Sequence, residues 1–147
     1  MNEKMNMKNW LFIALAFVVF SGNSYAEQPV TKERQQLFKK IENNTEMLED
    51  LVDELNWEKS ERLANQVSQD VLKLKQLFPK ESIGDGRSKK KILKEWPSFE
   101  KKINDWSLFY RQVEKASKAR DENQVENAMD EASSACRSCH MKYRSLW

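Results

Sequence analysis

The chain has 147 residues, of which 33% are charged and 39% hydrophobic, and its formal net charge is +2 at pH 7. A balance this close to neutral gives no support to a nucleic-acid-binding function. The length suits one domain, but few large apolar side chains remain among so many charges to build its core.

The N-terminus carries a targeting pattern. Two lysines precede an apolar run of 11 residues, WLFIALAFVVF at positions 10–20, which is too short to span a bilayer as a helix. Ser24 and Ala26 supply the small side chains of a signal-peptidase site. We expect residues 1–26 to be a cleavable signal peptide, with an uncleaved anchor as the alternative. The mature domain, residues 27–147, then has 23 basic and 22 acidic side chains and no membrane association.

The first half of the mature chain predicts two amphipathic helices, at residues 31–55 and 58–78, and no segment shows convincing strand alternation. Pro79 ends the second helix because it cannot continue the hydrogen-bond pattern. Apolar residues at spacings of three and four should face the core. They are Leu37, Phe38, Ile41, Leu48, Leu51, Val52 and Leu55 in the first helix, and Leu63, Val67, Val71, Leu74, Leu77 and Phe78 in the second.

The second half predicts a loop and two more helices. The stretch PKESIGDGRSKKK, residues 79–91, is typical of a solvated connection. A third helix is expected at residues 97–120, with Pro97 in its first turn. Its expected buried side consists of Phe99, Ile103, Trp106, Phe109, Tyr110 and Val113.

The last helix should open at Asp121, which with Gln124 three residues on forms a capping box. It continues through Val125, Met129 and Ala132 into the only cysteines of the chain. Four helices of about 20 residues each predict an all-α fold, an antiparallel up-down-up-down four-helix bundle.

The only two cysteines and the only histidine lie within ACRSCHMKYR, as Cys136, Cys139 and His140. Cys-x-x-Cys-His is the attachment sequence for haem c, in which both thiols bind the porphyrin and the histidine ligates the iron. On a helix the two cysteines differ by about 300°, so both reach one edge of a flat macrocycle. We therefore expect one covalent haem c, which would also supply apolar contact that the core lacks.

The motif has two other interpretations. A disulfide or a thioredoxin-like redox pair expects the motif at the start of a helix after a strand, and no strand is predicted before it. A zinc site needs a fourth ligand beside two cysteines and one histidine. Both are weaker than the haem interpretation.

With these residues in place, the mature chain resembles the cytochrome c′ family, the class II c-type cytochromes. The resemblance rests on Tyr143 and Arg144 after the haem motif, and on Arg34 and Gln35 of ERQQLF in the first helix. It implies that Arg34 and Gln35 lie at the haem edge, with Arg34 a partner of a propionate. It also implies that Arg144 screens the proximal face beside His140, whereas a solvated cation at a helix C-terminus is the alternative.

The ligand at the sixth coordination position of the iron decides between two functions. A second histidine is excluded there, because the chain has only one. Met141 adjoins His140, and Met129 is on the same helix. Met47 falls about 180° from Phe38 around the first helix, and so points away from the apolar stripe. The resemblance places Phe38 on the distal side, where six-coordinate relatives carry methionine. Phenylalanine has no donor atom, so we predict a five-coordinate haem.

The leading hypothesis is a periplasmic, non-enzymatic haem protein that binds nitric oxide, and carbon monoxide more weakly, with one-electron redox cycling. The alternative is a six-coordinate electron carrier serving a respiratory partner, with Met47 or a lysine amine as sixth ligand. Arg137, Lys142 and Arg144 could steer an acidic redox partner or be merely solvated. A homodimer through the first two helices, with Met47 or Trp57 contributing, stays open beside a monomer. Trp106 is the tryptophan expected to contact haem.

Overall fold

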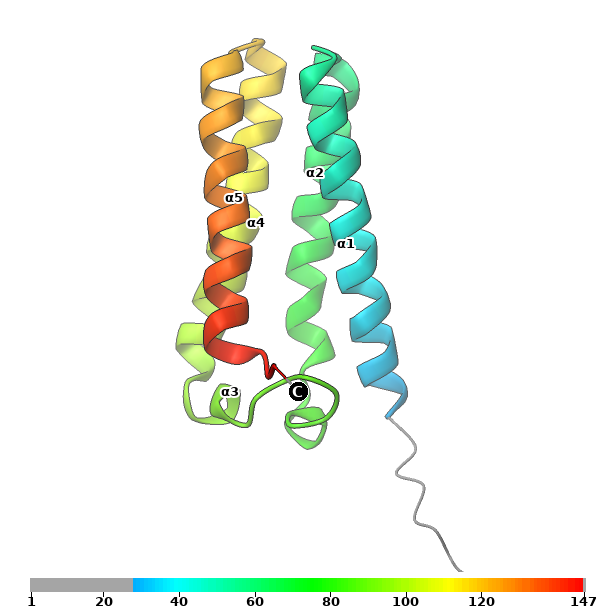
Figure 1. Ribbon diagram of the computed structural model, residues 1–147, viewed down its shortest axis with the longest axis vertical. Coiled ribbons are helices and arrows are strands. Elements are labelled where there is room, and N and C mark those ends of the chain that lie inside the picture. The colour runs from blue at the N-terminus through cyan, green and yellow to red at the C-terminus, as the bar shows by residue number, and fades with distance from the viewer. Residues whose placement is uncertain (1–27, 147) are drawn as a thin grey trace, which may run out of the picture.

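The computed structural model describes residues 28–146, so the predicted signal peptide and Trp147 lie outside the described residues. The α-helices are α1 (Pro29–Asp53), α2 (Trp57–Lys73), α3 (Lys91–Lys94), α4 (Trp96–Ala119) and α5 (Glu122–Tyr143), and the 3₁₀ helices are η1 (Leu74–Leu77) and η2 (Lys80–Ser82). The four long helices stand side by side as an antiparallel bundle (Figure 1). The predicted fold class is confirmed. No helix in the described part of the chain has the length and apolar character to cross a membrane.

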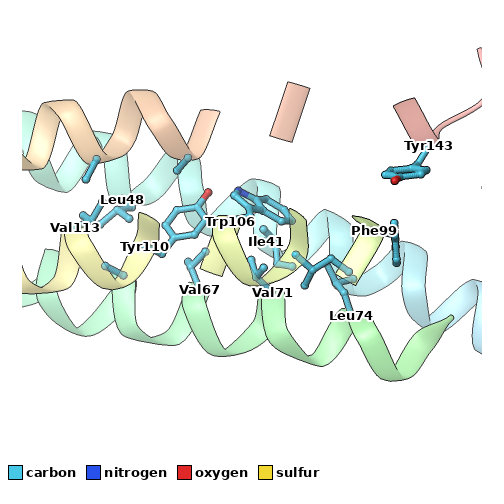
Figure 2. Packing of buried hydrophobic residues seen from close by; sticks show 14 of the residues in the cluster. Ile41, Leu48, Val67, Val71, Leu74, Phe99, Trp106, Tyr110, Val113 and Tyr143 are labelled. Carbon is cyan, nitrogen blue, oxygen red and sulfur yellow. The ribbon is translucent and has the colours of Figure 1, made fainter. Parts of the chain in front are cut away.

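The core follows the predicted helical stripes (Figure 2). On α1 these are Ile41, Leu48 and Val52, and on α2 and η1 they are Val67, Val71 and Leu74. The predicted side of α4 is buried at Phe99, Ile103, Trp106, Tyr110 and Val113, and α5 adds Val125 and Ala132. Leu37, Phe38, Leu51, Leu63, Leu77, Phe109 and Met129 are only partly buried. Phe38 is partly exposed because it borders a cavity, described below.

The end of α1 differs from the prediction. Leu55, expected on the buried stripe, is 51% exposed and has a φ of 56°. The N–H of Leu55 donates to the Val52 carbonyl and the N–H of Asn56 to the Leu51 carbonyl, the paired bonds of a Schellman motif. The prediction for Leu55 was wrong because the helix ends at Asp53 and the chain reverses.

The start of α5 was predicted correctly. The Asp121 carboxylate accepts a hydrogen bond from the Gln124 N–H at 3.1 Å. The Gln124 side-chain amide also donates to this carboxylate, rather than approaching the Asp121 N–H. That N–H instead donates to the Ala116 carbonyl, in the motif that ends α4.

The connection between η1 and α4 is more ordered than the solvated loop that was expected. Ile83 within it is 6% exposed. The Lys89 N–H donates to the Tyr143 carbonyl at 2.9 Å, and the Ser145 N–H donates to the Arg87 carbonyl at 2.7 Å. These bonds fasten the connection to the end of α5, and Figure 1 shows both at the same end of the bundle. Pairing across more than 50 residues has no local sequence pattern, so the prediction missed it.

Candidate functional site

A cavity of about 750 Å³ lies among α1, α4 and α5, a volume typical of small-molecule and cofactor sites. All seven residues predicted for the site line it: Arg34, Gln35, Phe38, Cys136, Cys139, His140 and Arg144. They come from two elements about 100 residues apart in the sequence. The fold therefore brings the predicted first-helix residues and the cysteine motif to one place.

The two thiols lie on one wall of the cavity. Cys136 and Cys139 are free, partly buried and one turn apart on α5. Burial raises the pKa of Cys136, and it raises the pKa of Cys139 to about 11. Both are neutral thiols at pH 7, unlike the thiolates of redox-active pairs. In addition, residues 28–146 hold no group of three or more His, Cys, Asp or Glu side chains placed to bind a metal ion.

His140 occupies the same wall, and Phe38 faces it from α1. Burial and the Arg144 charge both lower the pKa of His140, which keeps the imidazole neutral with a free nitrogen lone pair at pH 7. The ring centroids of Phe38 and His140 are 6.3 Å apart, and the rings are tilted by 59°. A basic ligand atom and an aromatic ring thus oppose each other across the cavity.

Arg34 is 4% exposed, and its guanidinium is directed largely at the protein itself. It donates to the Leu77 carbonyl at 3.0 Å, the Ser82 hydroxyl at 3.2 Å and the Asp85 carbonyl at 3.3 Å. It also lies over the Phe78 ring, 4.4 Å from the centroid. Arg34 therefore ties α1 to the connection after η1, a role that the sequence did not reveal. Its pairing with a propionate stays a prediction.

Two arginines border the cavity near His140. Arg144 follows the last residue of α5 with an extended backbone, lines the cavity and is exposed, and its place beside the iron stays a prediction. Arg87 also lines the cavity and was missed. Its guanidinium donates to the Leu146 carbonyl at 2.8 Å and the Ser145 carbonyl at 3.3 Å. Only the tertiary contact between the connection and the chain end brings Arg87 here.

The methionines lie elsewhere. Met47 is 54% exposed and Met141 is 71% exposed, and no methionine is among the described residues that line the cavity. Lys39, next to Phe38 in sequence, does line it. Of the two alternative sixth ligands, a lysine belongs to a residue of the cavity wall and Met47 does not.

The wall that α4 contributes to the cavity is aromatic, and its tyrosine hydroxyl has a hydrogen-bond partner. Trp106 is 7% exposed and lines the cavity, as expected for the tryptophan nearest the site. The Thr45 hydroxyl donates to the Ile41 carbonyl at 2.8 Å, so the Tyr110 hydroxyl, 2.7 Å away, is the donor to Thr45. Burial raises the pKa of Tyr110 to about 12 and keeps this group neutral. The wall offers apolar contact for a flat group.

The sequence model of the family described as cytochrome C′ matches residues 29–144, most of the chain. The chain belongs to the cytochrome c′ family. No curated protein sequence matches it.

Solved cytochromes c′ share the fold. A nitric oxide complex of a cytochrome c prime mutant from Alcaligenes xylosoxidans superposes with a TM-score of 0.72 at 17% identity, covering 79% of this chain and 94% of that one. The recombinant native protein from the same organism gives the same four values. A cytochrome c′ described as having an unusual ligand-controlled dimer dissociation reaches 0.72 at 18% identity, covering 82% and 97%. At such identities the likeness shows the fold alone.

Family membership fixes the cofactor. Cytochromes c′ carry covalently attached haem c, as the Cys-x-x-Cys-His motif predicted for this chain. They are periplasmic haem proteins of electron transfer and gas binding. The residues fit such a group: two thiols and a neutral imidazole stand on one wall of a cavity whose other walls are mainly apolar. The roles of individual residues stay predictions.

Proposed function

We propose that this cytochrome c′ is a periplasmic, non-enzymatic haem protein that binds nitric oxide, and carbon monoxide more weakly, at a single five-coordinate haem c. The observation that carries the proposal is the opposition of His140 and Phe38 across the cavity, with their ring centroids 6.3 Å apart. Export would rest on a signal peptide at residues 1–26, which leaves residues 27–147 as the haem domain.

Several residues of this chain would hold the haem, each through a different contact. The thiols of Cys136 and Cys139 would anchor one edge, and His140 would present a neutral imidazole nitrogen to the iron. Both thiols are protonated at pH 7, so each would bring its own proton to the thioether linkage. The bound haem would supply an iron that changes oxidation state by one electron and accepts a gas ligand. Gln35, at the cavity edge, would contact the haem rim.

Phe38 would determine which ligands the iron accepts. Two carbon contacts of about 3.5–4.0 Å add up to about 7–8 Å, which exceeds the 6.3 Å between the ring centroids of Phe38 and His140. A flat group would therefore fit between them with the imidazole meeting it edge-on through a nitrogen, or with a small shift of the phenyl ring. The phenyl ring has no donor atom for the iron and no hydrogen bond for bound dioxygen. These properties favour nitric oxide over oxygen and leave the iron without a sixth protein ligand.

The solved relatives support nitric oxide as the ligand. The oligomeric state of this chain stays a proposal. One solved relative is a nitric oxide complex, and another is described by its ligand-controlled dimer dissociation. In this chain Met47 is 54% exposed on α1, and Trp57 at the start of α2 is partly buried. A homodimer through α1 and α2 would cover both side chains. Size-exclusion chromatography with light scattering distinguishes it from a monomer.

A six-coordinate electron carrier is the second candidate function, and one observation favours it. Lys39, the residue next to Phe38 in sequence, lines the same cavity. A lysine ligand would produce a low-spin haem and block the gas site. Lys39→Ala would then convert the spectrum to high spin.

The first test is spectroscopic. Optical and resonance Raman spectra of the purified ferric and ferrous protein, with and without nitric oxide, report the spin state and ligand uptake. High-spin ferrous haem that binds nitric oxide supports the proposal. Low-spin spectra in both oxidation states contradict it and favour electron transfer.

The attachment is tested separately. Cys136→Ala and Cys139→Ala should each leave haem bound through a single thioether, and the double variant should release haem on acid–acetone extraction. Ser138→Ala, a change between the same cysteines, should retain covalent haem. Intact-protein mass spectrometry measures the outcome, and covalent haem in the double variant would contradict the assignment.

A further inference from the structure

The charged side chains of this nearly neutral chain are segregated along the bundle. One end, formed by residues 79–96 and 137–146 and called here the basic end, contains nine basic and three acidic side chains, a net charge of +6. The basic residues are Lys80, Arg87, Lys89, Lys90, Lys91, Lys94, Arg137, Lys142 and Arg144. The connection between η1 and α4 and the chain end lie together at this end in Figure 1.

The opposite end carries the opposite charge. Residues 46–62 and 111–131, called here the acidic end, surround the turns from α1 to α2 and from α4 to α5 (Figure 1). They contain 13 acidic and six basic side chains, a net charge of −7. Since α1 alone spans 25 residues, or about 37 Å, the two groups of charge are well separated. The molecule is an electric dipole along its long axis.

Most cations of the basic end are not neutralised within the protein. Among the residues that the structure describes, only Lys91 and Lys142 of the nine form ion pairs, and both share Glu95. Lys90, Lys94 and Arg144 are exposed. Intramolecular pairing therefore does not account for this concentration of positive charge.

The basic end also presents apolar surface and reaches the haem cavity. Leu93 is 44% exposed, Met141 71% and Leu146 80%, which are half of the large apolar side chains exposed in residues 28–146. Arg87 and Arg144 belong both to this surface and to the cavity wall. The surface is held in place by backbone hydrogen bonds between the connection and the chain end. Exposed apolar side chains among like charges, at the end of the molecule that reaches the cavity, suit a weak and short-lived protein complex.

We propose that the basic end is a docking surface for an acidic redox protein, which would exchange one electron with the haem through the cavity edge at Arg87 and Arg144. The electron exchange rests on the proposed function, because it needs the haem. The docking of the partner does not depend on it. The dipole would orient the acidic partner toward this end and repel it from the acidic end. In the exchange the iron changes between ferrous and ferric, and the partner is reduced or oxidised by the same electron.

A pair of matched variants tests the docking. Lys90→Glu/Lys94→Glu changes the basic end, and Lys115→Glu/Lys118→Glu changes α4 near the acidic end, and all four lysines are exposed. Each double variant lowers the net charge by four. Poly-L-glutamate serves as a redox-inert acidic polypeptide, and its binding to the haem-loaded protein is measured by calorimetry in about 0.1 M salt, where the Debye length is about 10 Å.

The basic-end variant should bind poly-L-glutamate about tenfold more weakly, and the control less than twofold, because screening confines the field to nearby charges. Lys90→Gln/Lys94→Gln should give an intermediate loss, which separates charge from misfolding. Equal losses in the basic-end and control variants would overturn the proposal, because net charge alone would then explain binding.

Electron exchange is tested with small reagents of opposite charge. Stopped-flow oxidation of the ferrous protein by hexacyanoferrate(III), an anion, should be several-fold slower in the basic-end variant than in the control at about 0.1 M salt. Oxidation by tris(phenanthroline)cobalt(III), a cation, should be faster. Changes of the same sign with both reagents would overturn the assignment of the haem edge to this surface.

Two further measurements separate the alternatives. Binding to phosphatidylglycerol vesicles without binding to poly-L-glutamate would overturn a protein partner in favour of an anionic membrane surface. Nitric oxide uptake by the ferrous haem is recorded in the same samples. Its absence in the unmodified protein would contradict the proposed function while leaving the poly-L-glutamate result intact, since that binding needs no ligand at the iron.

Discussion

Phe38 is the residue on which the proposed ligand chemistry depends. Its ring faces His140 across the cavity, and no methionine lines the described part of the wall. Phe38→Met places a thioether where the phenyl ring now lies and should convert most of the haem from high to low spin. Optical and electron paramagnetic resonance spectra measure the change.

The control for this substitution is Phe38→Leu, which removes the ring without adding a donor atom and should leave the haem high spin. An unchanged spectrum in Phe38→Met would mean that residue 38 does not face the iron. The comparison therefore tests the geometry and not simply the tolerance of the site to mutation.

Arg34 raises a different question, because its guanidinium already donates to Leu77, Ser82 and Asp85. Hydrogen bonds from charged groups each contribute about 1.5–3 kcal/mol, so Arg34→Gln should lower the free energy of unfolding by about 2–3 kcal/mol. If the hydrogen bonds from Arg34 to the connection dominate, the free energy of unfolding falls by the same amount with and without haem. A loss confined to the haem-loaded protein would favour the propionate role. Chemical denaturation of both forms measures it.

At the scale of elements, an ion pair between a buried carboxylate of α2 and an exposed amine of α1 joins the two helices. The Asp70 carboxylate is 1% exposed, 2.7 Å from the Lys40 amine of α1 and 2.9 Å from that of Lys73. Burial raises the pKa of Asp70, but the hydrogen bonds and charges of Lys40 and Lys73 outweigh it, and the pKa lies below its usual value. The carboxylate therefore stabilises the fold while it is ionised.

The pH dependence of the protein's stability follows from the lowered pKa of Asp70. Because the pKa of Asp70 is lower in the folded state, its contribution is complete above the unfolded value of about 3.9 and is lost as pH falls through the folded value. Asp70→Asn should cost about 1.5–3 kcal/mol at pH 7, and the difference from the unmodified protein should shrink below about pH 4. Denaturant titrations at several pH values measure it. A difference independent of pH would contradict the ionic contribution.

The turn between α1 and α2 holds a strained residue. Leu55 has a φ of 56°, a conformation that costs a residue with a β-carbon about 1–2 kcal/mol, and its side chain is 51% exposed. Leu55→Gly should therefore stabilise the protein by about 0.5–1 kcal/mol, raising Tm by several degrees. Leu55→Ala, which keeps the β-carbon, should bring no such gain. Equal melting temperatures for the two variants would contradict strain as the cause.

At the scale of the whole molecule, the cavity makes stability depend on the cofactor. Emptying the space of one leucine side chain in a core costs about 2.7–5 kcal/mol, and this cavity of about 750 Å³ is far larger. Haem-free protein should melt at least 10 °C below the haem-loaded form while retaining most of its helix signal. Circular dichroism melts compare the two. Equal melting temperatures would show that haem does not complete the core.

The sequence by itself determined the four helices, their buried stripes and the haem motif. Helical spacing is a local property, so Ile41, Val67 and Val113 were placed in the core correctly. Cys-x-x-Cys-His is a contiguous pattern, so its chemistry could be inferred without a fold. The resemblance added Arg34 and Phe38, whose place at the cavity no local pattern determines.

Only the tertiary structure decided what distant segments do together. The hydrogen bonds of Arg34 reach residues 43 to 51 positions away, and Arg87 joins the cavity through contacts with the chain end 58 and 59 positions away. The basic end likewise arises because two charged segments fold to the same end of the bundle. Such contacts depend on the arrangement of whole helices in space, which the periodicity of a single segment does not encode.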